Sequence, residues 1–89
     1  MSSRLTDGPR LRLLGRRGCH LCDEAREVVV AVAVEAGVAW DEVDVDTDGD
    51  LADEYGDRVP VVLLDGREHA YWRVDAERLR AALSGRRIW

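Results

Sequence analysis

The sequence predicts an α/β fold in which a four-stranded mixed sheet is flanked by three helices. Its 89 residues suit one domain built around one core. Short strand-like apolar segments alternate with helix-like segments in the order β-α-β-α-β-β-α. The dipeptide Asp65-Gly66 is a strong hairpin signal, so we expect the last two strands to be antiparallel neighbours.

The chain begins with a predicted strand and a predicted helix. Polar and apolar residues alternate from Arg10 to Leu14, as expected of a strand that enters a core. Residues 28–34 are rich in valine, which favours strands. The apolar pattern nevertheless extends from Cys19 to Ala36, more than twice the usual strand length of about 5–6 residues. Because acidic residues begin this segment and Gly37 follows it, we predict a helix.

The middle of the chain is expected to form a strand and a short helix. Alternation from Val38 to Asp46 predicts a strand with one buried face. The sequence Thr47-Asp48-Gly49-Asp50 resembles a capping box and predicts a helix that continues to Gly56. Both connections so far contain helices, and helical crossovers usually join parallel strands. We therefore expect strands one, two and three to be parallel.

The last part of the chain is expected to form a hairpin and a final helix. Strands over residues 59–64 and 67–72 flank the predicted turn. Asp75 is a favoured N-cap residue for a helix that ends near Ser84-Gly85. We place the domain at residues 10–85, between a flexible leader at residues 1–9 and a tail at residues 86–89.

The composition restricts the classes of binding partner and the cellular compartment that we expect. The formal net charge of −5 argues against binding to nucleic acid and to anionic membrane surfaces, because both require an excess of cations. No apolar stretch approaches the ~20 residues of a membrane span. The first nine residues show no apolar signal-peptide region. We therefore expect a cytoplasmic protein.

Both cysteines lie in one cluster, Cys19-His20-Leu21-Cys22, between the first strand and the first helix. A thiol at a helix N-terminus meets unpaired backbone N–H groups and the positive end of the helix dipole, and both favour the thiolate. The thiolate is the nucleophile, and a second cysteine three residues further on can resolve a mixed disulfide. The cluster therefore predicts thiol–disulfide chemistry.

Other interpretations of these residues stay open. The two cysteines can be inert buried thiols. A zinc site needs four ligands, and only His20 and His69 remain beyond the pair, so we expect no metal. His20 either supports the thiolate by its charge or is simply solvated. The acidic residues between positions 41 and 50 mostly alternate along a strand and are expected to form a solvated face.

These motifs resemble those of glutaredoxin-like proteins, specifically a small bacterial single-domain group with the thioredoxin fold. The resemblance covers about residues 10–84 and rests on the segments Gly18-Cys19-His20-Leu21-Cys22-Asp23 and Arg58-Val59-Pro60-Val61. It implies a cis peptide bond before Pro60, beside the cysteine pair. It also implies that Cys19 attacks a disulfide and that Cys22 resolves the mixed disulfide.

The resemblance implies substrate-binding residues as well. Val59 is expected to pair its backbone N–H and C=O with an extended substrate. Arg16 stands where glutathione-binding relatives carry a lysine, and it either holds a carboxylate or remains a solvated loop residue. Asp75 offers an acid at a helix start. Trp72-Arg73 replaces the Gly-Gly that closely approaches glutathione in those relatives, so we expect weak and poorly selective glutathione use.

The predicted function is that of a dithiol oxidoreductase of glutaredoxin type, acting on protein disulfides or small-thiol mixed disulfides. We expect no tightly bound cofactor, a low-molecular-weight thiol (glutathione or another) as electron donor, and a monomer. Two other functions stay open. One is a non-catalytic binding module that retains the motif. The other is an iron–sulfur cluster carrier, in which Cys19 of each of two subunits and small thiols hold the cluster.

Overall fold

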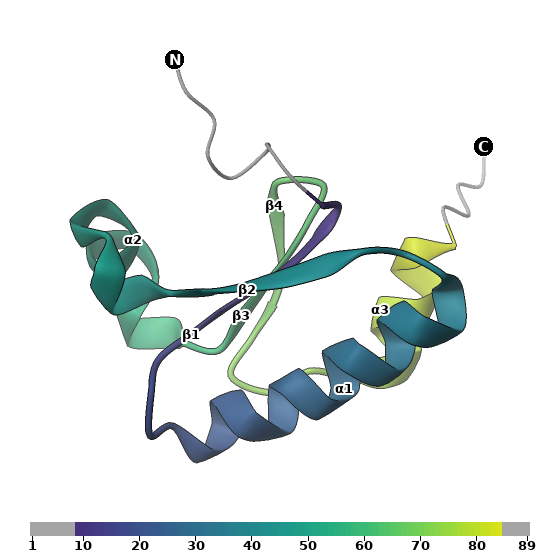
Figure 1. Cartoon of the computed structure of the whole chain (residues 1–89), viewed down its shortest axis with the longest axis horizontal. Coiled ribbons are helices and arrows are strands. Elements are labelled where there is room, and N and C mark those ends of the chain that lie inside the picture. The colour runs from purple at the N-terminus through teal and green to yellow at the C-terminus, as the bar shows by residue number, and fades with distance from the viewer. Residues whose placement is uncertain (1–8, 85–89) are drawn as a thin grey trace.

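The computed structural model of the chain describes residues 9–84, so most of the predicted leader and the predicted tail lie outside the described residues. The predicted α/β fold and its order of strands and helices are confirmed (Figure 1). The strands are β1 (Leu11–Gly15), β2 (Trp40–Asp44), β3 (Val61–Leu64) and β4 (Arg67–Tyr71). The helices are α1 (His20–Ala36), α2 (Gly49–Tyr55) and α3 (Ala76–Leu83), and two 3₁₀ turns, η1 (Val45–Thr47) and η2 (Gly56–Arg58), flank α2.

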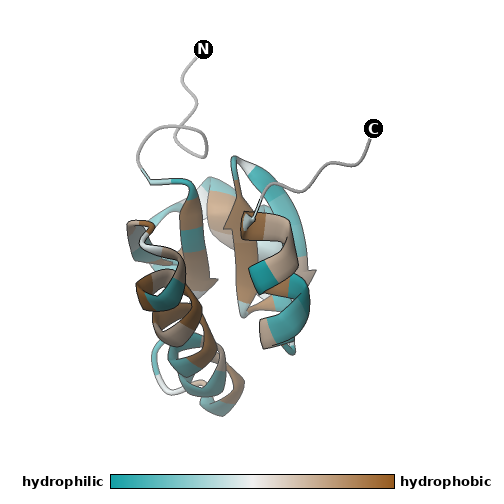
Figure 2. Ribbon diagram, turned by 90° about the vertical axis from the view of Figure 1, so that its right-hand side faces the viewer, coloured by the Kyte–Doolittle hydropathy of each residue, from teal (hydrophilic) through white to brown (hydrophobic). Residues whose placement is uncertain are grey.

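Two apolar clusters, one on each face of the sheet, hold the layers together. Along β1, Leu13 belongs to the cluster under α1 and α3, whereas Leu14 belongs to the cluster under α2. This division follows from the strand geometry, since successive side chains point to opposite faces. Strand β3 is therefore apolar on both faces, and so is β1 except at Arg12; Figure 2 shows hydrophobic residues concentrated in these central strands.

The sheet has the order β2-β1-β3-β4, and one predicted strand direction is wrong. Strand β2 is parallel to β1 as expected, but β3 is antiparallel to β1. Helix α2 is short and stands at the end of the sheet where β1 and β2 finish (Figure 1). Its 7 residues span about 10 Å, too little to return the chain to the far end of the strands. The chain therefore enters β3 from the same end, which makes β3 antiparallel.

Helix α1 forms despite its run of valines because its inner face is long and continuous. Its buried positions include Ala25, Val29 and Val32, which follow helical rather than strand periodicity. Gly37 ends the helix with a left-handed backbone (φ 70°), and its N–H donates to the carbonyls of Ala33 and Val34. The predicted helix over this segment is thus confirmed.

The local turn signals are mostly confirmed. Asp65 and Gly66 both have positive φ, of 54° and 83°, as a two-residue hairpin turn requires. The capping-box prediction is wrong by one residue, because Asp48 and not Thr47 caps α2. The Asp48 carboxylate accepts hydrogen bonds from the N–H groups of Asp50 and Leu51. The Thr47 hydroxyl instead donates to the carbonyl of Asp44, since η1 separates β2 from α2.

None of the helices in residues 9–84 is both long enough and apolar enough to span a membrane.

Candidate active site

Three backbone segments meet at the end of the sheet where β1 finishes. The register pairs Leu14 of β1 with Val61 of β3, and Val61 with Tyr71 of β4. Beyond these pairs, the residues that follow Leu14 and Tyr71 and the residue that precedes Val61 lie side by side along this edge. They are Gly15, Trp72 and Pro60. The N–H of Trp72 donates to the carbonyl of Pro60 at 2.8 Å, and the Val59–Pro60 peptide bond is cis, as predicted.

Cys19 lies directly at the N-terminus of α1. It has an extended backbone (φ −103°, ψ 113°), and its Sγ accepts a hydrogen bond from the N–H of Cys22 at 3.1 Å. The thiol is half-buried, and no disulfide joins it to Cys22. A thiolate at this position receives a backbone N–H and the positive end of a 17-residue helix. The predicted position of Cys19 at the head of the helix is confirmed.

Cys22 lies one turn further along α1 and is fully buried. Burial raises the pKa of the Cys22 thiol to about 12, and the hydrogen-bond contact with Cys19 acts in the same direction. The backbone N–H of Arg16 and the guanidinium of Arg26 act in the opposite direction. Cys22 is therefore a protonated thiol at neutral pH, unlike an attacking nucleophile.

An ion-pair network lies behind Cys22. Arg26 makes two hydrogen bonds of 2.7 Å to the carboxylate of Glu42 and one of 2.9 Å to Asp23. Gly15 brings this network close to the thiol: a Cβ atom built at Gly15 would lie 3.4 Å from Cys22 Sγ and 3.6 Å from Glu42 Oε2. Strand β1 thus packs directly against Cys22 at Gly15, at ordinary van der Waals distance.

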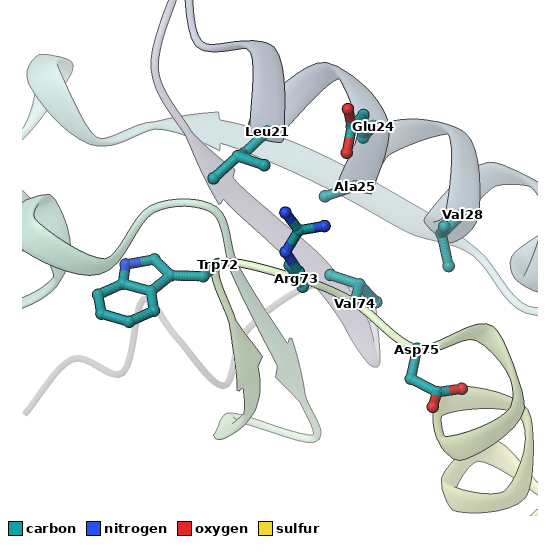
Figure 3. Close-up of a pocket in the computed structure, with 8 residues that line it drawn as sticks. All are labelled: Leu21, Glu24, Ala25, Val28, Trp72, Arg73, Val74 and Asp75. Carbon is teal, nitrogen blue, oxygen red and sulfur yellow. The ribbon is translucent and has the colours of Figure 1, made fainter.

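A cavity of about 340 Å³ lies between the first two turns of α1 and the segment that joins β4 to α3. Figure 3 shows the side chains of Leu21 and Arg73 pointing toward each other across it, while the indole ring of Trp72 points away from Arg73. Leu21 lies between the two cysteines in the sequence, so part of the cavity wall belongs to the helical turn that carries the cysteine pair. The residues that line it are Leu21, Glu24, Ala25, Val28, Trp72, Arg73, Val74 and Asp75.

Asp75 lies in this cavity but is already engaged. Its Oδ1 accepts hydrogen bonds from the N–H groups of Glu77 at 2.9 Å and Arg78 at 3.3 Å, so it caps α3 as predicted. Two of the N–H groups that an external carboxylate could use at this helix N-terminus are therefore already occupied by Asp75.

Of the other predicted site residues, Val59 and Pro60 lie on the same edge as the cysteine pair. The backbone N–H of Arg16 contacts the Cys22 thiol, but its side chain is directed to Asp46. Val59 is extended (φ −64°, ψ 143°), and the ladder of β3 begins only at Val61. Arg16 pairs with both carboxylate oxygens of Asp46 at 3.0 Å, and that guanidinium lowers the pKa of Asp46. His20 is exposed in the first turn of α1.

Sequence reasoning did not place three residues near the cysteines: Gly15, Arg26 and Glu42. Arg26 and Glu42 are 16 positions apart, and no local pattern indicates that they pair behind Cys22. Gly15 directly follows the predicted strand over residues 10–14, and no sequence pattern placed it beside Cys22. Within residues 9–84, no group of three or more histidine, cysteine or acidic side chains is arranged to hold a metal ion.

The fold and the position of the cysteine pair define a thioredoxin-fold protein with a C-x-x-C motif at the start of its first helix. Residues 10–84 match the family described as Glutaredoxin-like domain (DUF836), and the chain belongs to this family. An uncharacterized protein of Mycobacterium tuberculosis is 44% identical over 81 residues, which are 85% of this chain and 84% of that protein.

Solved structures support the same fold. A structural genomics target protein from X. campestris has a TM-score of 0.70 and 41% sequence identity, with 86% of this chain and 99% of that chain covered. The glutaredoxin of Archaeoglobus fulgidus has a TM-score of 0.62 over 93% of this chain and 95% of its own. At 14% identity this second similarity concerns the fold alone.

Proposed function

We propose that the protein is a thiol–disulfide oxidoreductase of glutaredoxin type in which Cys19 attacks and Cys22 resolves. The observation that carries the proposal is the contrast between the two thiols. Cys19 is accessible and its Sγ already accepts a backbone N–H, whereas Cys22 is fully buried with a pKa raised to about 12. Only Cys19 therefore combines access with stabilisation of negative charge on sulfur.

The reaction proceeds in two exchanges. The Cys19 thiolate attacks one sulfur of the substrate disulfide, forms a mixed disulfide, and releases the first substrate thiolate, which takes up a proton. Cys22 then loses its proton and attacks Cys19 Sγ, which releases the second substrate thiolate and leaves a Cys19–Cys22 disulfide. The substrate gains two electrons, and the protein loses two. A low-molecular-weight thiol restores the dithiol by the reverse exchanges.

The surrounding residues orient the substrate in this proposal. The extended backbone of Val59, beside Pro60, pairs with an extended segment around the half-cystine. Arg16 can hold a substrate carboxylate only after it releases Asp46, and His20 offers a solvated imidazole next to Cys19. We propose that the protein works as a monomer in the reducing cytoplasm, where its dithiol is regenerated.

Glutathione is proposed to be a poor electron donor. The helix N-terminus that would receive the γ-glutamyl carboxylate is capped by Asp75, and Trp72 stands where a glycine would allow close approach. Reduction of a mixed-disulfide substrate should therefore depend only weakly on glutathione concentration. Saturation at a low KM, with strong preference over other thiols, would contradict this part of the proposal.

The test is reduction of insulin disulfides with dithiothreitol as the terminal reductant. The wild-type protein should accelerate reduction. The variant Cys22→Ser, reduced beforehand and then mixed with insulin after removal of dithiothreitol, should accumulate a mixed disulfide through Cys19 that mass spectrometry detects. Absence of turnover together with absence of the mixed disulfide would reject the proposal and favour a binding module. A visible absorption spectrum after anaerobic purification would instead indicate an iron–sulfur cluster.

A further inference from the structure

Trp72 has an unusual backbone conformation at the edge that carries Pro60. Its φ is +63°, in the left-handed region that bulky residues rarely adopt. Its N–H is fixed to the carbonyl of Pro60 at 2.8 Å. Glycine would occupy this position without strain, so the presence of tryptophan requires a reason in its side chain.

Packing in the hydrophobic core does not explain why tryptophan occupies this position. The residue is 51% exposed, and its indole N–H donates a long hydrogen bond of 3.4 Å to the carbonyl of Asp57. Tyr71, 46% exposed, packs against it edge to face with ring centroids 5.1 Å apart. The two rings thus form an exposed aromatic pair, Tyr71 and Trp72, on the end of β4. Such surface is characteristic of recognition rather than of folding.

The aromatic pair is continuous with the candidate active site. Trp72 follows Pro60 along the same edge, and it lines the cavity whose opposite wall includes Leu21, the residue between the cysteines. An extended segment bound along Val59 would therefore run past the indole. Leu21, Ala25 and Val28 form the apolar part of the cavity wall, and the indole ring points away from Ala25 and Val28, outside the cavity (Figure 3).

We propose that Trp72 determines substrate specificity by contacting a large apolar or aromatic side chain next to the half-cystine of a polypeptide disulfide. This inference rests on the proposed function and names its substrate class as polypeptide disulfides. A polypeptide suits this edge because it carries both a backbone that can pair with Val59 and a side chain that can reach the Trp72 ring. Burial of a side chain against the indole would give the attraction.

The charges of the cavity support an apolar contact over an anionic ligand. Its wall carries the carboxylates of Glu24 and Asp75 against the single guanidinium of Arg73, which makes no side-chain hydrogen bond or ion pair among residues 9–84. This excess of negative charge would repel a small thiol that carries several carboxylates. It would not repel a neutral apolar side chain.

The experiment compares two short peptide disulfides that differ only in phenylalanine or serine beside the half-cystine, with bis(2-hydroxyethyl) disulfide as a small substrate. Dithiothreitol is the reductant throughout. The wild-type protein should prefer the phenylalanine peptide by about five-fold in kcat/KM, mainly through KM. Trp72→Gly should lose this preference while it retains activity on the small disulfide. Val34→Ala is the matched control, because Val34 is an exposed apolar residue (75%) at the other end of α1.

Redox-inert peptides, with serine in place of cysteine, separate this inference from the proposed function. The phenylalanine peptide should shift the Trp72 indole N–H signal in an NMR titration, and the serine peptide should not. This result would support the inference even if no disulfide is turned over. Equal losses by Trp72→Gly on all three substrates, an unchanged preference, or a loss confined to the small disulfide would overturn it. If the glycine variant does not fold, Trp72→Phe should keep the preference and Trp72→Ser should lose it.

Discussion

Helices α1 and α3 both begin beside the candidate active site, and their N-caps differ in chemistry. Cys19 caps α1 through a sulfur atom, which accepts the N–H of Cys22 at 3.1 Å. Asp75 caps α3 through a carboxylate, which accepts two N–H groups. The same backbone requirement is thus met by a thiol at one helix and by a carboxylate, which occupies two N–H groups, at the other. In the proposed function, the side chain of the N-cap residue determines which helix N-terminus takes part in thiol–disulfide exchange.

The largest expected effect comes from replacing the cap of α1 by one that is chemically inert. Serine is itself a favoured N-cap, so Cys19→Ser should retain the stability of α1 within about 0.5 kcal/mol. Turnover of disulfides should nevertheless fall by on the order of 10³-fold or more, because the nucleophile is lost. Urea unfolding and insulin reduction measure the two effects. Residual turnover close to the wild-type rate would show that Cys19 is not the nucleophile.

The second prediction concerns Cys22, the buried thiol whose backbone N–H donates to Cys19. The folded-state pKa of Cys22 is raised to about 12, above the ordinary thiol value of ~8.5. The buried, protonated thiol therefore contributes fully to the free energy of unfolding below about pH 8.5, and this contribution is lost as the pH rises toward 12. The free energy of unfolding of the wild-type protein should therefore fall between pH 8.5 and 10 more steeply than that of Cys22→Ala. The difference should approach about 1–2 kcal/mol at pH 10.

The comparison of the two slopes is the control for this second prediction. Tyr55 also has a pKa raised by burial, but it is present in both proteins and cancels in the difference. Parallel pH dependences in the two proteins would show that the Cys22 thiol ionises as easily in the folded state as in the unfolded chain.

The third prediction breaks the cap of α3. Asp75→Ala should lower the free energy of unfolding by about 1 kcal/mol, and Asp75→Asn should lower it much less, because asparagine also caps helices. Chemical denaturation of the three proteins measures this difference. An alanine variant as stable as the asparagine variant would mean that water satisfies the N–H groups of Glu77 and Arg78 equally well.

The smallest expected effect concerns Arg16, which lies beside the cap of α1 but pairs with Asp46. Both partners are exposed, so Arg16→Ala and Asp46→Asn should each change stability little at neutral pH. Since Arg16 lowers the pKa of Asp46, any contribution is present above the ordinary carboxyl pKa and is lost as the pH falls below it. A double-mutant cycle at low and high salt measures the coupling, and a large, salt-independent coupling would contradict the prediction.

Sequence patterns identified most of the elements because their signals are local. The Asp65-Gly66 turn, the Gly37 helix end and the Asp75 cap each depend on a few neighbouring residues. The direction of β3 could not be predicted in this way, because it depends on how far α2 carries the chain across the sheet. The capping residue of α2 was misplaced for a related reason, since η1 occupies the residues before Asp48.

By itself the sequence determined where the cysteine pair stands and which proline lies near it. The C-x-x-C spacing at a strand–helix junction and the Val59-Pro60 dipeptide are local features of the chain, and their geometry follows from helix and peptide-bond preferences. Only the tertiary structure decided what surrounds the pair. It buries Cys22 behind Gly15, sets the Arg26–Glu42 ion pair beside it, and exposes Trp72 next to Pro60. These neighbours come from strands and helices far apart in the sequence, so their contacts exist only once the sheet register is formed.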